Sequence, residues 1–79
     1  MTAIKERGQF VLSGGADLAN GAGTDAKAIA RFAGLSEKAV QRILAGQKST
    51  WVRCAKVVRA LQAMGAKDAS LDAVSRQGA

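Results

Sequence analysis

Side chains that could carry out catalysis are few in this chain. It has no histidine and a single cysteine, Cys54. Zinc sites built from cysteine and histidine are therefore excluded, as are Cys–His and Ser–His–Asp catalysis. The aspartates Asp17, Asp25, Asp68 and Asp72 are scattered, without the spacing of metal ligands or of a nucleophile beside a base. We expect no enzymatic activity, no metal site and no cofactor.

Positive charge is the most prominent chemical feature of the sequence. Twelve Lys and Arg residues oppose six Asp and Glu, which gives a formal net charge of +6. Between residues 27 and 67, Glu37 is the one acidic residue among nine cations: Lys27, Arg31, Lys38, Arg42, Lys48, Arg53, Lys56, Arg59 and Lys67. This field indicates a polyanionic partner, but net charge alone does not separate nucleic acid from an anionic membrane or an acidic protein.

Two short helices are predicted in the middle of the chain. Thr24 or Asp25 can cap a helix that begins at Ala26, because their side-chain oxygens accept hydrogen bonds from backbone N–H groups. Gly34 follows where a left-handed residue ends a helix, and Ser36 offers the next cap. Apolar residues recur at helical spacing around this turn: Ala26, Ile29, Ala30 and Ala33 before it, then Leu35, Ala39, Val40, Ile43 and Leu44 up to Gly46.

A third, longer helix is predicted after a polar loop at residues 47–50. Its apolar residues repeat at three- and four-residue steps until Gly65: Trp51, Cys54, Val57, Val58, Leu61 and Met64. Cys54 fits this face as a small buried hydrophobe. Residues 68–75 then predict a short last helix with Leu71 and Val74 as its apolar contacts, before a frayed end.

The first 23 residues leave two interpretations open. Apolar residues at seven-residue spacing predict a helix near residues 3–13: Ile4, Val11 and Leu18. Alternatively, residues 9–12 form a short strand that ends at the following glycine pair, since such pairs favour turns. Five glycines weaken the helix propensity of this segment.

Length and composition bound the fold. With 79 residues the chain has room for one domain, consisting of a glycine-rich segment 1–23, a helical centre 24–66 and a tail or short helix 67–79. Its apolar fraction of 48%, with only three aromatic residues, favours small, closely packed helices. We therefore expect a compact all-α fold of four to five helices.

Length and composition also indicate which partners and which cellular location to expect. A core of this size contributes only a few kcal/mol, so a homodimer would complete its burial. No apolar run approaches the roughly 18 residues that a membrane span requires. A lone cysteine fits a reducing compartment. We expect a cytoplasmic protein without membrane contact.

Residues 24–66 resemble the helix-turn-helix of the Cro/repressor (Xre-like) family, whose domains have the lambda-repressor-like fold. The resemblance lies in the core residues, the small residue at the helix crossing and the turn glycine: Ile29, Ala30, Ala33, Gly34, Leu35, Val40 and Ile43. Residues 39–46, the polar loop and residues 59–65 are also similar to the headpiece of LacI-type repressors. The glycines of residues 1–23 depart from the family, in which the first helix is usually continuous.

The resemblance implies a set of DNA contacts. The helix that follows Ser36 would enter the major groove, while the helix before it lies over the phosphates. Side chains that reach base edges are then Glu37, Lys38, Gln41 and Arg42, which match cytosine, guanine, adenine and guanine respectively. Phosphate contacts are expected from Lys27, Ser36, Lys48, Ser49, Thr50 and Arg53.

The resemblance further implies a homodimeric transcriptional repressor of phage or plasmid type that binds a palindromic operator in double-stranded DNA. One alternative is an antitoxin-like protein-interaction module, and another is an architectural or membrane-surface protein that binds by charge alone. Two residues also have structural interpretations. Glu37 can favour its helix dipole, and Trp51 can lie in the core or in a dimer interface.

Overall fold

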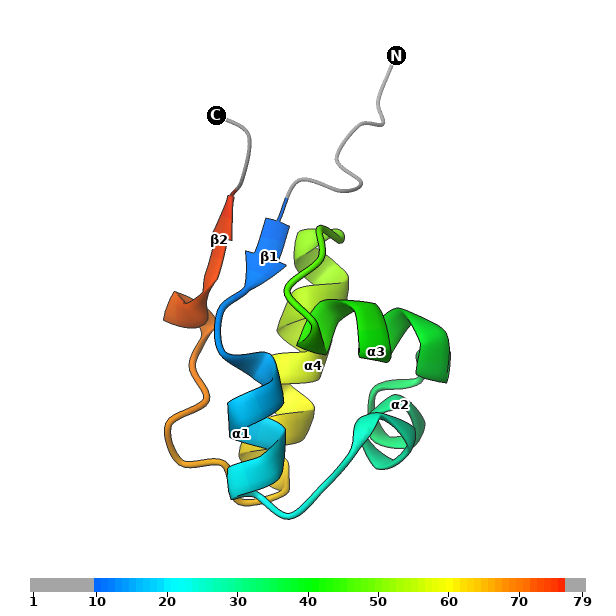
Figure 1. Ribbon diagram of the computed structural model, residues 1–79, viewed down its shortest axis with the longest axis vertical. Coiled ribbons are helices and arrows are strands. Elements are labelled where there is room, and N and C mark those ends of the chain that lie inside the picture. The colour runs from blue at the N-terminus through cyan, green and yellow to red at the C-terminus, as the bar shows by residue number, and fades with distance from the viewer. Residues whose placement is uncertain (1–9, 77–79) are drawn as a thin grey trace.

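The computed structural model describes residues 10–76, which form a mostly helical molecule with one small sheet (Figure 1). In chain order its elements are β1 Phe10–Leu12, α1 Gly15–Gly21, α2 Ala26–Ala33, α3 Glu37–Leu44, α4 Trp51–Ala63, the single 3₁₀ turn η1 Leu71–Ala73, and β2 Val74–Arg76. The expected predominance of helix is confirmed. The described chain is not purely α-helical, because its two ends pair as antiparallel strands.

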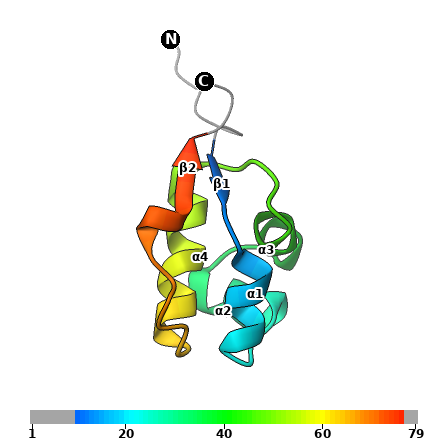
Figure 2. The same cartoon turned by 60° about the vertical axis from the view of Figure 1, so that its left-hand side comes forward.

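Helices α2 and α3 have the boundaries that the sequence predicts. Asp25, and not Thr24, caps α2, since its Oδ1 accepts from the N–H of Ala28 at 3.0 Å. Gly34 ends the helix at φ 72°, a left-handed conformation that glycine adopts without a Cβ penalty. The Oγ of Ser36 then accepts from the N–H of Ala39 at 3.1 Å and starts α3. As Figures 1 and 2 show, α3 lies across the long axes of α1 and α4.

Helix α4 provides most of the core. Thr50 caps it by accepting from the N–H of Arg53 at 3.2 Å. Its buried residues are Cys54, Ala55, Val57, Val58, Ala60 and Leu61. Trp51 is 45% exposed, so a core position for it is wrong. The reason is helical geometry, because Trp51 stands at the edge of the buried face, in a row with Ala55 and Arg59.

The sheet decides between the two interpretations of the N-terminal segment. Phe10 to Leu12 form a strand, as the glycine-pair interpretation predicts, and pair in antiparallel register with Val74 to Arg76. On its other edge β1 exchanges backbone hydrogen bonds with Ser49, at 2.9 and 2.7 Å. A helix over residues 3–13 is therefore wrong for residues 10–13, and its first part lies outside the described residues.

The C-terminal helix expected over residues 68–75 is also wrong. Only the η1 turn is helical there, and the chain then extends into β2. The cause is tertiary, since pairing with β1 satisfies the backbone groups of residues 74–76 that a helix would otherwise satisfy.

The sequence did not predict α1, a short helix in a glycine-rich stretch. A Cβ on Gly15 would lie 3.1 to 3.2 Å from atoms of Leu12 and Leu44. The absence of a side chain at Gly15 thus allows α1 to approach β1 and α3 closely. Packing overrides the low helix propensity of glycine at this point.

One apolar core joins these elements. Leu12 from β1, Ile29 from α2, Val40 and Ile43 from α3, and Leu61 from α4 are all at most 1% exposed. Figures 1 and 2 both show the two strands side by side at one end of the molecule and α1 and α2 toward the other end. Helix α3 packs against this core through Val40 and Ile43, and its opposite face is exposed to solvent.

Candidate nucleic-acid interface

Helix α3 presents a continuous polar face to solvent. Val40 and Ile43 are fully buried and fix which side of the helix faces the core. Because successive residues are about 100° apart around an α-helix, the side chains opposite this pair point outward. These exposed side chains are Glu37, Lys38, Gln41 and Arg42. All four residues predicted to read bases therefore share one surface.

A hollow of about 460 Å³ lies beside α3, lined by Gly34, Leu35, Ser36, Lys38, Ala39, Arg42 and Arg53. Three of these side chains are cations, and they come from two helices, α3 and α4. The lining contains no acidic residue. Like charges gathered around a concave surface favour an anionic occupant, because they raise the local positive potential.

Gln41 and Glu37 interact within the exposed face. The Nε2 of Gln41 donates to the Oε2 of Glu37 at 3.3 Å, one helical turn away. One N–H of the amide and its carbonyl oxygen remain available, and this donor–acceptor pair matches the major-groove edge of adenine. Glu37 also lies in the first turn of α3, where a carboxylate interacts favourably with the helix dipole.

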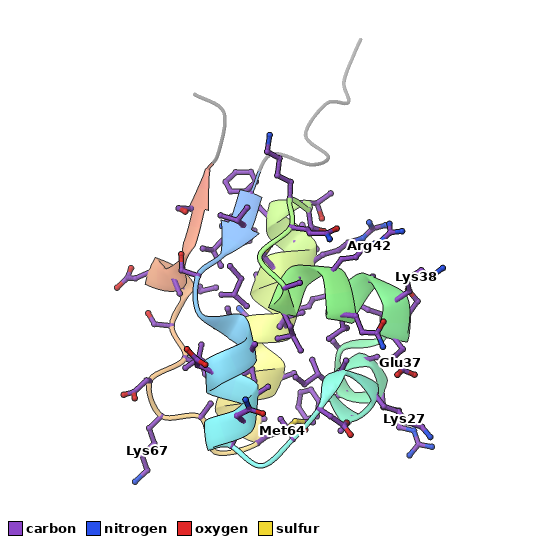
Figure 3. The ribbon with its side chains drawn as sticks, in the orientation of Figure 1. Lys27, Glu37, Lys38, Arg42, Met64 and Lys67 are labelled. Carbon is purple, nitrogen blue, oxygen red and sulfur yellow. The ribbon has the colours of Figure 1, made fainter. Side chains whose placement is uncertain are left out.

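The residues predicted to contact phosphates are not all in one place. Ser36 and Arg53 line the hollow. Lys27 is exposed in the first turn of α2, and Lys48 is exposed in the loop after α3. In Figure 3, Lys27, Glu37, Lys38 and Arg42 lie along one side of the molecule, with Lys67 on the opposite side.

Three of the predicted phosphate contacts also have structural roles. The backbone N–H and carbonyl of Ser49 both bond to Phe10, so only its half-buried hydroxyl is left for a ligand. The hydroxyl oxygens of Thr50 and Ser36 accept hydrogen bonds as helix caps, and each can still donate its own hydrogen.

Sequence reasoning missed the floor of the hollow and one exposed aromatic residue. Gly34, Leu35 and Ala39 line the hollow, although the pattern indicated only turn and core roles for them. Phe32 on α2 is 59% exposed. The signal for Phe32 was its position outside the apolar face of α2, which Ile29 and Ala30 define.

Three other features bear on function in the described part of the chain: a thiol, potential metal ligands and the length of the helices. Burial raises the pKa of the Cys54 thiol, because the apolar surroundings penalise the thiolate, which is the nucleophilic form. Within residues 10–76 no three potential metal ligands from His, Cys, Asp and Glu lie together. No helix among the described residues has the length and apolarity needed to cross a bilayer.

Comparison with models of known families, with curated proteins and with solved structures found no match. What the protein binds must therefore be inferred from the chemistry of α3 and of the hollow beside it.

Proposed function

We propose that this protein is a sequence-specific double-stranded DNA-binding regulator of transcription with a lambda-repressor-like helix-turn-helix fold. One observation carries the proposal: the exposed face of α3 bears hydrogen-bonding side chains next to a cationic hollow without acidic lining residues. Side chains on this face can distinguish bases by hydrogen bonding to their edges, and the hollow can accept a phosphate.

Dimensions and side-chain chemistry support α3 as the recognition helix. The major groove of B-DNA is about 12 Å wide and admits one α-helix. Lys38 and Arg42 can donate to O6 and N7 of guanine, and Gln41 can pair with adenine. Glu37 orients the amide of Gln41 through the 3.3 Å hydrogen bond, or accepts from cytosine where that base is presented.

Phosphate contacts would then set the register of α3 in the groove. Arg53 approaches the hollow from α4, while Lys27 and Lys48 are exposed before and after the α2–α3 unit. Together with the hydroxyls of Ser36 and Thr50, these groups can contact the backbone without reading sequence. Ser49 contributes at most its hydroxyl, since its main chain is bonded to β1.

The proposal extends to a homodimeric repressor in the cytoplasm. Two copies related by a twofold axis would bind a palindromic operator whose half-sites are about 34 Å apart, one turn of DNA. Repression would follow from excluding polymerase, in the manner of phage or plasmid regulators. No cofactor takes part in this mechanism.

Selection of bound sites from random duplex DNA tests the proposal. We expect enrichment of a symmetric motif that persists when the salt concentration is raised from about 0.05 to 0.2 M, because base contacts survive when phosphate contacts weaken. A scrambled duplex of the same composition is the control. Binding that is lost at the higher salt and enriches no motif would contradict the proposal and would favour an architectural or antitoxin-like role.

A further inference from the structure

One face of helix α4 carries exposed apolar and cationic side chains beside each other. Trp51 is 45% and Val52 56% exposed, and together with Ala55, Lys56 and Arg59 they line a shallow hollow of about 230 Å³. We call these five residues the α4 groove. Ala55, 6% exposed, lies at its base. The α4 groove shares no residue with the exposed face of α3 or with the cationic hollow.

We infer that the α4 groove binds an acidic amphipathic helix of another protein, which packs an apolar side chain on Trp51 and Val52 and pairs its carboxylates with Lys56 and Arg59. The inference goes beyond the proposed function, because it concerns a protein partner and uses residues that the proposed DNA contacts do not. It rests on the shape of the groove, on the order of side chains along it and on its charge.

The shape of the groove indicates a helical partner. Four of its residues have the spacing i, i+3, i+4 and i+7, namely Val52, Ala55, Lys56 and Arg59. Residues at this spacing are neighbours on a helix surface and surround one depression, which a side chain of a facing helix can enter as a knob enters a hole. An amphipathic helix supplies such side chains at regular intervals along one face.

The two ends of the groove differ in chemistry. Trp51 and Val52 provide exposed apolar area at the beginning of α4, whereas the two cations follow it along the helix. Lys56 lies about one turn and Arg59 about two turns after Val52. Carboxylates that flank an apolar side chain of the partner can therefore reach both cations. The methylene groups of the cations can cover apolar surface at the same time.

The charge of the groove selects an acidic partner. Helix α4 has no acidic residue, so Lys56 and Arg59 have no carboxylate on their own helix to pair with. The chain as a whole has a net charge of +6, which disfavours a basic occupant. A carboxylate that approaches the groove is attracted by both cations. The exposed apolar area and the charge are thus satisfied by one class of partner, an acidic helix with an apolar face.

The small extent of the groove predicts a weak complex that is sensitive to salt. The axis of α4 rises about 12 Å from Trp51 to Arg59, so a helix seated in the groove buries only part of the roughly 800 Å² per partner of stable complexes. Its ion pairs lie at the surface, where salt screens them. The affinity should therefore fall as salt rises, while the apolar contact persists.

Titration of the full chain with a capped helical peptide, which presents one face of Leu with Glu on both sides, tests the inference. Trp51 is the only tryptophan, so its emission reports on the groove. We expect saturable binding with a blue shift of this emission, and weaker binding when salt rises from about 0.05 to 0.5 M. Two matched peptides should bind about tenfold more weakly, one with Gln in place of Glu and one with Ala in place of Leu.

Variants of the protein locate the contact. Lys56→Gln and Arg59→Gln combined should weaken peptide binding about tenfold, and Val52→Ala about threefold. Arg31→Gln and Lys67→Gln combined are the matched control, because they remove the same two charges from exposed positions outside the groove. This control should change the affinity less than about twofold. Circular dichroism establishes that each variant is folded.

Three results would overturn the inference. The first is that the Glu peptide does not bind, or binds no better than the Gln peptide. The second is that Lys38→Gln and Arg42→Gln weaken its binding as much as Lys56→Gln and Arg59→Gln do, since the peptide would then occupy the exposed face of α3 in place of DNA. The third is a blue shift of Trp51 emission that follows protein concentration and not peptide, which would assign the groove to a second copy.

Discussion

At the scale of single residues, the burial of Cys54 changes the titration of its thiol in a way that can be measured. Its side chain is fully buried on α4, and this burial raises the pKa of the thiol. The unfolded chain therefore loses the thiol proton at lower pH than the folded chain. Below the ordinary thiol pKa the free energy of unfolding is independent of this group, and it falls as the pH rises past that value.

Denaturant unfolding between about pH 7 and 10 should show this decrease in the wild type. Cys54→Ala provides the reference, because it lacks the thiol but keeps the other titrating groups. We expect the alanine variant to be less stable at neutral pH and to lose less stability on going to pH 10. Parallel pH dependences in the two proteins would show that the thiol is not coupled to folding.

The residues of the candidate site that could be predicted from sequence are those whose placement depends only on their own helix. The exposure of Lys38 and Gln41 depends only on helical periodicity around Val40 and Ile43, so it could be predicted. The meeting of Arg42 with Arg53 could not, because it depends on how α3 and α4 pack. Nor could the bonding of the Ser49 main chain to Phe10, which joins distant parts of the chain.

At the scale of elements, the α2–α3 turn depends on the conformation of Gly34. Its φ of 72° is unfavourable for a residue with a Cβ, although an added Cβ would meet no atom within 4 Å. Gly34→Ala should therefore lower the free energy of unfolding by about 1 to 2 kcal/mol through backbone strain alone.

Gly21→Ala is the matched control for this substitution. Gly21 lies in α1 without a positive φ, and its Cβ would also have open space. Replacing it should raise stability by about 0.4 to 1 kcal/mol, because alanine restricts the unfolded chain. Thermal or denaturant unfolding measures both changes, and a loss of stability at Gly21 as large as that at Gly34 would refute the conformational explanation.

Elements with local sequence signals were predicted better than elements without them. Helices α2, α3 and α4 have caps, periodic apolar faces and glycine ends, and these local signals agree with one another. The short elements α1 and β2 lack such signals. Helix α1 forms where Gly15 permits close packing, and β2 forms because β1 supplies its hydrogen-bonding partners.

At the scale of the whole molecule, the sheet joins the two ends of the described chain. Strand β1 lies between β2 and Ser49, and its Leu12 is 1% exposed within the core. A chain that stops after Ala73 loses β2 and uncovers β1. We expect the free energy of unfolding to fall by about 1 to 3 kcal/mol, measured by denaturant unfolding.

A chain that stops after Arg76 keeps the β1–β2 pairing and serves as the reference. Equal stability of the two shortened chains would mean that the sheet does not contribute to the fold. Helix α3 packs on α1, α2 and α4 as well as on β1, so we expect the loss of β2 to lower stability while the exposed face of α3 keeps its arrangement.

The central claim is that α3 reads DNA sequence while the loop after it contacts only the backbone. Selection from random duplex DNA with Arg42→Ala and Lys48→Ala in parallel tests this claim most directly. Arg42→Ala should cost about 1 to 3 kcal/mol at the selected site and relax discrimination at one base position, whereas Lys48→Ala should weaken all sequences alike. Identical motifs and identical losses for the two variants would contradict the claim.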